Sequence, residues 1–206
     1  RSTDLRPLVS NGEPLYNNLI LFTPKMVVVP SMTVHDILSF SRLGGNVIAA
    51  VDGRSSNNSL VFELAIACNL RVTHAAAVFG LPETKIGMGA NFGSVLLPRL
   101  IGVTQALEML LTGEYISAER ALELGLMNRL VPAEDVLKQA ISLARTIAKN
   151  APISVRRVKA VALRGLDLSV ASALRQDPGM NPYLSEDRQE GIAARLEKRS
   201  PVWKNR

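Results

Sequence analysis

Residues 46–69, NVIAAVDGRSSNNSLVFELAIACN, contain two apolar runs separated by a polar segment. The first run, 46–52, is short and β-branched and ends at a glycine, which predicts a buried strand. The second run, 59–68, is apolar on all sides, which predicts a buried helix. Glu63 is the one carboxylate inside that helix, and a buried carboxylate must be paired, neutralised or facing a cavity. Two roles therefore stay open for Glu63: an ion pair with Arg71, or a functional group.

The rest of the chain continues this alternation and then becomes helical. Further strands are predicted over 70–74, 77–81 and 126–131, and helices over 94–102, 104–113 and 117–125. After residue 131 the predicted elements are all helices, over 133–150, 152–165, 167–176 and 185–199. The segment 7–33 predicts a long loop with one strand at 26–30. We expect an α/β core over residues 1–131 and a helical subdomain over 132–206.

The composition excludes several classes of protein. The chain has 206 residues, and none of its apolar runs reaches the roughly 18 residues that a membrane-spanning helix needs. The single cysteine, Cys68, excludes an internal disulfide and a cysteine cluster for zinc, and its apolar neighbours predict a small buried side chain. The two histidines, His35 and His74, do not form a metal-binding motif, so we expect no metal site.

The charge of the chain is uneven. The net charge is +6; residues 1–148 hold 12 Lys/Arg and 12 Asp/Glu, whereas residues 149–206 hold 12 and 6. A basic C-terminal region favours a solvated helix face or a subunit contact first, the phosphates of a cofactor second and RNA third. Aromatic residues make up only 4% of the chain, which gives base stacking little support, although the basic C-terminus does not exclude nucleic acid.

Motifs along the chain follow one another as AAVDG, ELAIACNLRV, AVFGLPETKIG, LPRLIG, LEMLLTGEYISAERALELGLMNRLVP and SEDRQEGIAARLEKRSPVWK. In this order and spacing they resemble the signature segments of the enoyl-CoA hydratase/isomerase (crotonase) family over residues 46–206. STDLR at 2–6 resembles the end of an earlier family segment, which implies that the chain starts inside the fold, without the first strands. The resemblance implies a crotonase-like α/β spiral of ββα turns and a C-terminal helical subdomain used in trimer assembly.

The resemblance assigns chemistry to two carboxylates. Glu63 and Glu83 match the positions of the two glutamates of family hydratases and share their separation of 20 residues. Hydration of a 2-enoyl-CoA thioester needs a base that activates the water attacking C3 and an acid that protonates C2. It also needs hydrogen-bond donors that stabilise the charge developing on the thioester oxygen. We assign Glu63 to the water and Glu83 to the C2 proton. Because isomerases of the family manage with one glutamate, the pair favours a hydratase.

The polar segment departs from the family, which usually has a glycine-rich run before the ELA motif. Counting from either end places the second oxyanion-hole N–H at Leu60 or Asn58, and the first donor would be Thr3. Glycine permits the closest backbone approach, and asparagine tolerates a positive φ better than leucine. Phe92 replaces a usually small residue, and Pro and Gly interrupt a normally helical stretch at 175–184. Because of these departures, two alternatives to a hydratase stay open. The first is a non-catalytic structural or scaffold subunit, and the second is an enoyl-CoA isomerase.

The resemblance also implies partners and a location. We expect an acyl-CoA thioester as the substrate, in fatty acid metabolism, with no cofactor of the protein's own. Lys198 and Lys204 are the expected CoA contacts, and a homotrimer or hexamer is the expected assembly. The basic charge and the lack of a signal peptide in the first residues suit the mitochondrial matrix, which we expect, with a bacterial cytoplasm as the alternative.

Overall fold

A parallel four-stranded sheet organises the part of the chain that precedes the C-terminal helices. The computed structural model describes residues 18–23, 38, 46–51 and 59–206, with side chains except at 18–23 and 60. The strand order is β1 (Asn18–Thr23), β2 (Asn46–Val51), β3 (Leu70–Thr73) and β6 (Arg129–Leu130), and each neighbouring pair is parallel. The sequence did not predict β1, and the strand expected at 26–30 lies outside the described residues.

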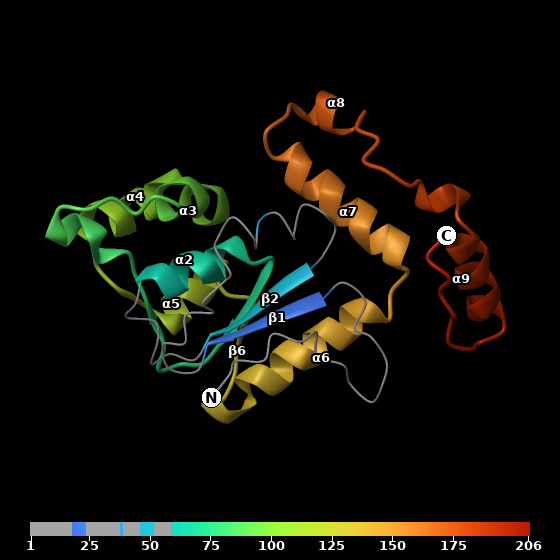
Figure 1. Cartoon of the computed structure of the whole chain (residues 1–206), viewed down its shortest axis with the longest axis horizontal. Coiled ribbons are helices and arrows are strands. Elements are labelled where there is room, and N and C mark those ends of the chain that lie inside the picture. The colour runs from blue at the N-terminus through green and yellow to red at the C-terminus, as the bar shows by residue number, and fades with distance from the viewer. Residues whose placement is uncertain (1–17, 24–37, 39–45, 52–58) are drawn as a thin grey trace.

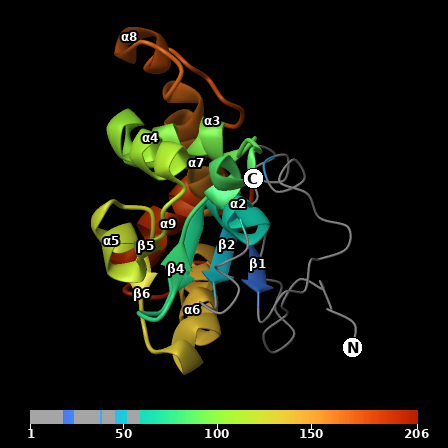
Figure 2. The same cartoon turned by 90° about the vertical axis from the view of Figure 1, so that its left-hand side faces the viewer.

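The two faces of β2 pack against different helices. Val47, Ala49 and Val51 belong to a core cluster that includes α2 (Ser59–Ala67), whereas Ile48 and Ala50 pack with α6 (Val136–Ala148). Successive side chains of a strand point to opposite faces, so a strand that is apolar throughout must be covered on both. Figures 1 and 2 show α2 on one side of the sheet and α6 on the other. The prediction of a buried strand followed by a buried helix is confirmed.

Shorter elements connect β3 to β6 and carry the segment that follows the second glutamate. β4 (Val78–Phe79) pairs antiparallel with β5 (Ile116–Ser117). The helices between β4 and β6 are η2 (Pro82–Ile86), α3 (Gly93–Ile101), α4 (Val103–Thr112) and α5 (Ala118–Glu123). The Ser117 hydroxyl caps α5 by accepting a hydrogen bond from the Arg120 N–H at 3.2 Å. The three helices expected in this region are confirmed.

The C-terminal region is helical, as expected, although one of its helices is much shorter than predicted. The elements after β6 are η3 (Ala133–Asp135), α6, α7 (Pro152–Gly165), α8 (Val170–Ala173), η4 (Pro182–Leu184) and α9 (Glu186–Leu196). The helix expected over 167–176 is wrong at both ends: α8 begins only after Ser169, whose hydroxyl caps it by accepting the Ser172 N–H, and it ends at Ala173, ahead of Pro178 and of Gly179 with its φ of 84°. The domain boundary at residue 132 stays a prediction.

One contact fixes α7 to the sheet region. Lys159 Nζ donates a hydrogen bond to Asn69 Oδ1 at 2.9 Å, and the same oxygen accepts the N–H of Val47 at 3.0 Å. Partial burial lowers the pKa of Lys159 to about 8. In the described residues, no helix has the length and apolar character needed to cross a membrane.

Candidate active site

Glu63 is buried in α2 and bonds to the start of another helix. Its side chain is 8% exposed, and Oε1 accepts hydrogen bonds from the Phe92 N–H at 3.1 Å and the Gly93 N–H at 2.9 Å. The first N–H groups of a helix have no acceptor within the helix, and its N-terminus carries partial positive charge. Glu63 therefore caps α3 across the fold. Its second oxygen, Oε2, has no hydrogen-bond partner among the described residues.

The ion pair between Glu63 and Arg71 is not formed, because Arg71 bonds to backbone carbonyls instead. Arg71 is 4% exposed, its Nε donates to Leu126 O at 2.5 Å, and its Nη1 donates to Cys68 O at 2.6 Å and Ala65 O at 3.3 Å. A cation near the C-terminal carbonyls of a helix is favourable. Burial nevertheless lowers the pKa of Arg71 from its ordinary value. Arg71 thus holds the last turn of the helix that carries Glu63.

Gly93 is required where α3 approaches its neighbours, and the sequence analysis did not identify it. A Cβ built on Gly93 would overlap Leu81 Cδ1, and it would lie 3.5 Å from Glu63 Oε1. Leu81 is fully buried, so its side chain has little room to move. The signal in the sequence was the glycine-rich segment after Glu83, because glycine allows close approach of the backbone.

Glu83 lies in η2 and has an oxygen without a partner. Its Oε2 is buried and, among the described residues, makes no hydrogen bond. Such buried and unpaired polar atoms are uncommon and are frequent at functional sites. The helix η2 starts at Pro82 and ends at Ile86, Gly87 follows it with a φ of 74°, and Thr84 Oγ1 donates to Leu110 O at 3.1 Å. These contacts fix the backbone that carries Glu83.

The connection between η2 and α3 relates the two glutamates, because Glu83 precedes it in the chain and Glu63 of α2 bonds to its far end. Glu83 precedes the residues 84–92 in the chain, and Glu63 binds the N–H groups of the residues that end this connection. Phe92 contributes its N–H to Glu63, while its side chain is 40% exposed and is therefore not part of the core.

The predicted oxyanion-hole donors are only partly described. Leu60 is the second residue of α2, so its N–H belongs to the first helical turn, where N–H groups lack acceptors within the helix. This position is compatible with an N–H that faces a ligand. Thr3 and Asn58 lie outside the described residues, and the role of all three stays a prediction.

Cys68 is a buried structural residue, as the sequence indicates. Its side chain is 4% exposed, its Sγ donates to Leu64 O at 3.2 Å, and burial raises the pKa of the thiol to about 12. A thiol with this pKa is not a nucleophile near neutral pH. Within the part of the chain that the structure describes, no group of three or more His, Cys, Asp or Glu side chains could hold a metal ion.

Lys198 and Lys204, the predicted CoA contacts, lie beyond the end of α9. Lys198 is exposed and has a φ of 55°, and Lys204 Nζ lies 3.6 Å from Glu186 Oε2. Figure 1 shows α9 at the opposite end of the molecule from α3, to which Glu63 binds. Within one chain, the structure does not bring these lysines to the two glutamates. A contact with CoA stays a prediction.

Comparisons with known proteins identify the family. The family model described as enoyl-CoA hydratase/isomerase matches residues 37–206. An (E)-benzylidenesuccinyl-CoA hydratase of Thauera aromatica is 37% identical over 171 residues, which are 82% of this chain and 66% of that protein. Enoyl-CoA hydratase domain-containing protein 2, mitochondrial, of Mus musculus is 40% identical over 162 residues, which are 75% of this chain and 54% of that protein.

A solved structure agrees with the sequence relatives. The crystal structure of enoyl-CoA hydratase from Bacillus anthracis matches with a TM-score of 0.73 and 33% identity, over 84% of this chain and 69% of that chain. This chain belongs to the enoyl-CoA hydratase/isomerase family and has the crotonase fold. It spans 54% and 66% of the two curated relatives named above, less than two thirds of either.

Proposed function

We propose that the protein hydrates a 2-enoyl-CoA thioester, with Glu63 and Glu83 as the acid–base pair. The observation that carries this proposal is that Glu63 keeps one oxygen without a partner while Glu83 has a buried oxygen without one. Unpaired oxygens on two carboxylates that one connection relates suit two proton transfers to one bound substrate. Family membership supports the choice of substrate class.

The proposed reaction adds the oxygen of water to C3 and a proton to C2. Glu63 accepts a proton from the attacking water, because both N–H contacts are made to Oε1 and Oε2 is left to act as the base. Glu83 donates the proton to C2. Negative charge develops on the thioester oxygen, and backbone N–H groups, among them that of Leu60, stabilise it. This chemistry requires no metal or redox cofactor.

The proposal extends to assembly and location. We expect a homotrimer or hexamer, in which Lys198 and Lys204 of one copy contact CoA bound to another. Several large apolar side chains are exposed in the single chain, and their burial between copies would favour an assembly; they include Val103, Leu111, Leu174 and Leu196. Relatives include bacterial and mitochondrial proteins, and we propose that this protein is located in the mitochondrial matrix. Import of the protein into isolated mitochondria, followed by fractionation, tests this location.

A kinetic experiment with conservative variants tests the proposal. Hydration of a short 2-enoyl-CoA is followed by loss of the enoyl thioester absorbance, for the parent protein, Glu63→Gln and Glu83→Gln. Each of these variants should lose about 10²–10⁴ in kcat, the usual contribution of a general acid or base. Glu119→Gln is the matched control, because Glu119 is an exposed glutamate of α5 and should keep full activity.

Three outcomes contradict the proposal in different ways. If neither the parent nor a variant hydrates the substrate, the non-catalytic alternative is favoured, and a thermal shift with acyl-CoA then shows whether the fold binds thioesters. If the parent only moves a double bond from a 3-enoyl-CoA, the isomerase is favoured. If the glutamine variants keep full activity, the two glutamates are not the acid–base pair.

A further inference from the structure

The helix η2, which carries Glu83, contributes no side chain to the hydrophobic core. None of its five residues is buried, although Leu81 directly before it is fully buried. A helix this short is marginal by itself, and burial of apolar side chains does not anchor it. Glu83 Oε2 is nevertheless buried and, among the described residues, unpaired. Contacts from outside η2 must therefore hold this helix and its carboxylate in place.

The C-terminal end of α4 supplies one such contact. Thr84 Oγ1 donates a hydrogen bond to Leu110 O at 3.1 Å. Leu110 belongs to the last turn of α4, where carbonyl groups have no N–H partner within the helix, so Thr84 satisfies a carbonyl that α4 leaves open. The helix α4 is itself fixed, because Ala106, Met109 and Leu110 are buried in the core. A firmly packed helix therefore anchors a weakly packed one.

Gly113 allows η2 to approach the end of α4 closely. It follows α4 with a φ of 62°, a left-handed conformation that favours glycine. A Cβ at this position would lie 3.1 Å from Lys85 Cγ and 3.2 Å from Pro82 Cα. Because Pro82 Cα is a backbone atom, it could make room only if the start of η2 moved with it. The absence of a side chain at Gly113 thus fixes the backbone next to Glu83.

An exposed ion pair lies across the same contact but holds it less firmly. Lys85 Nζ lies 2.6 Å from Glu114 Oε1, and the two side chains are 45% and 72% exposed. Ion pairs with this exposure contribute little to stability, because water screens them and two long side chains must be ordered. The anchoring of η2 therefore depends on Thr84 and Gly113 more than on this pair.

We propose that Gly113 and Thr84 are positioning residues, which hold η2 on the end of α4 and so keep the Glu83 carboxyl group at C2 of the substrate. This inference rests on the proposed role of Glu83 in hydration. Neither residue is required to touch the substrate, since both act through η2. Proton transfer requires a close approach of the reacting groups, and a displacement of about 1 Å can cost about 10² in rate. A glycine thirty positions beyond Glu83 in the chain would thus set the geometry of the reaction.

Two glycine variants separate the contact with η2 from strain in the backbone. Gly113→Ala should lower kcat for hydration of a short 2-enoyl-CoA about tenfold, with little change in KM, because Glu83 acts in the proton transfer. Gly125→Ala is the matched control. Gly125 has a φ of 75°, so alanine is strained there as well, but its Cβ would meet nothing within 4 Å. Gly125→Ala should therefore keep the kcat of the parent.

A second pair of variants tests the hydrogen bond to α4. Thr84→Val keeps the shape of the side chain and removes the bond to Leu110 O, so it should lower kcat, although less than Gly113→Ala does. Thr146→Val is its control, because Thr146 Oγ1 bonds to Ser142 O at 3.0 Å within α6. In a Glu83→Gln background, Gly113→Ala and Thr84→Val should cause no further loss, since a positioning residue acts only through the group that it positions.

A stability measurement tests the anchor without any reaction. Glu83→Met replaces the carboxylate by an apolar side chain, which removes the buried unpaired oxygen and should raise Tm by about 2 °C or more. In Gly113→Ala this gain should be smaller, because a displaced η2 exposes the carboxylate to water. In Gly125→Ala the gain should equal that in the parent.

Three results overturn the proposal. The first is an active parent in which Gly113→Ala and Gly125→Ala have the same kcat. The second is a loss in Gly113→Ala that persists undiminished in Glu83→Gln, which would indicate general damage to the site. The third is an equal gain in Tm from Glu83→Met in both glycine variants, which would mean that the end of α4 does not hold Glu83. If the parent hydrates no enoyl thioester, the proposed function fails, and the third comparison still decides whether the anchor exists.

Discussion

Replacing Gly93 by alanine should destabilise the protein, whereas the same change at Gly89 should not. The Cβ of Gly93→Ala would overlap Leu81 Cδ1, and Leu81 is fully buried. Overpacking of this kind costs about 1–3 kcal/mol. A Cβ at Gly89 would meet nothing within 4 Å, and Gly89 is not among the glycines with positive φ, so Gly89→Ala should be neutral or stabilising by up to about 1 kcal/mol.

The two alanine variants are compared by urea unfolding at one fixed protein concentration, because assembly would otherwise change the apparent stability. The expected difference in free energy of unfolding is about 1–4 kcal/mol, which combines the overpacking cost with the gain at Gly89. Each kcal/mol lowers Tm by about 2–4 °C in a domain of this size. Gly93→Ala should also lower hydration activity, because relief of the overlap moves the N–H groups that bind Glu63 Oε1.

Equal stability of the two alanine variants would refute this reasoning. It would mean that the start of α3 does not pack against Leu81 as closely as the structure shows, and that the contact between Gly93 and Glu63 is not held by that packing. A destabilised Gly93→Ala with full activity would refute only the second part, the dependence of Glu63 on the position of α3.

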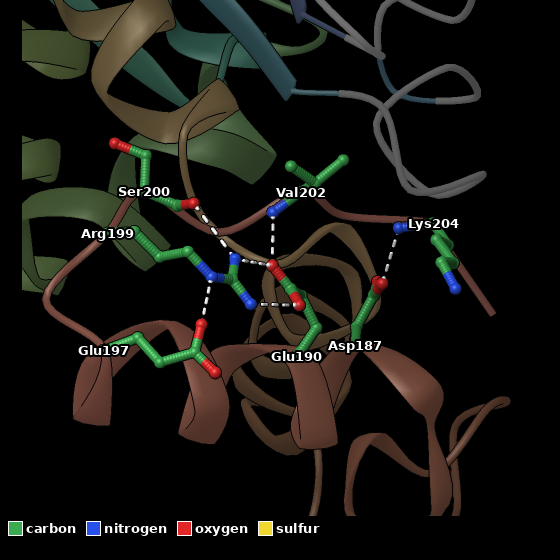
Figure 3. A network of polar contacts seen from close by, with 7 residues as sticks. All are labelled: Asp187, Glu190, Glu197, Arg199, Ser200, Val202 and Lys204. Atoms are coloured by element: carbon green, nitrogen blue, oxygen red, sulfur yellow. Dashed lines mark hydrogen bonds and ion pairs between the residues drawn. The ribbon is translucent and has the colours of Figure 1, made fainter.

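Three further predictions concern other buried or charged groups. Hydrogen bonds from Arg199 and Val202 (Figure 3) lower the pKa of Glu190 from 4.5 to about 2. The contribution of Glu190 to stability is therefore present above pH 4.5 and is lost as the pH falls toward 2. Trp203 emission should change over this pH range, and Glu190→Gln should abolish that pH dependence. Asp187→Asn should cost about 1–3 kcal/mol in urea unfolding, because an amide nitrogen in place of Oδ2 cannot accept the Asn205 N–H and the negative charge that strengthens the bonds to the tail is lost. Asp167→Asn, at an exposed 3.8 Å ion pair, should change stability by less than about 0.5 kcal/mol. Cys68 should resist alkylation at pH 8 in the folded protein and react in urea, because burial raises its pKa to about 12; rapid labelling without denaturant would contradict its burial.

The sequence was most informative where a pattern repeats within one element. The apolar residues 46–51 and the apolar run that holds Glu63 predicted a strand and a helix with covered faces, and both are confirmed because burial depends on local periodicity. The sequence was least informative about partners distant in the chain. Arg71 was the natural partner for Glu63 by charge, yet backbone N–H groups about thirty positions away bind Glu63 instead.

The same limit applies to the helices. The prediction of a helix over 167–176 followed from its composition, but Ser169 acts as the N-cap and the helix covers only Val170–Ala173. β1 was missed because its apolar run stands next to Asn17 and Asn18, which are typical of loops. A pocket between α7 and α9 could not be predicted from the sequence, since it depends on how two helices and the tail pack together.

The bond from Glu63 to the start of α3 bears on how relatives of this protein should be interpreted. Because the same carboxylate caps a helix and is proposed to activate water, its loss would carry a folding cost as well as a catalytic one. A descendant that no longer catalysed any reaction would still need an oxygen at this position to accept the two N–H groups, and glutamate or glutamine supplies it. Retention of Glu63 in a genome is therefore weak evidence of activity, whereas retention of Glu83, whose Oε2 has no structural partner among the described residues, is stronger evidence.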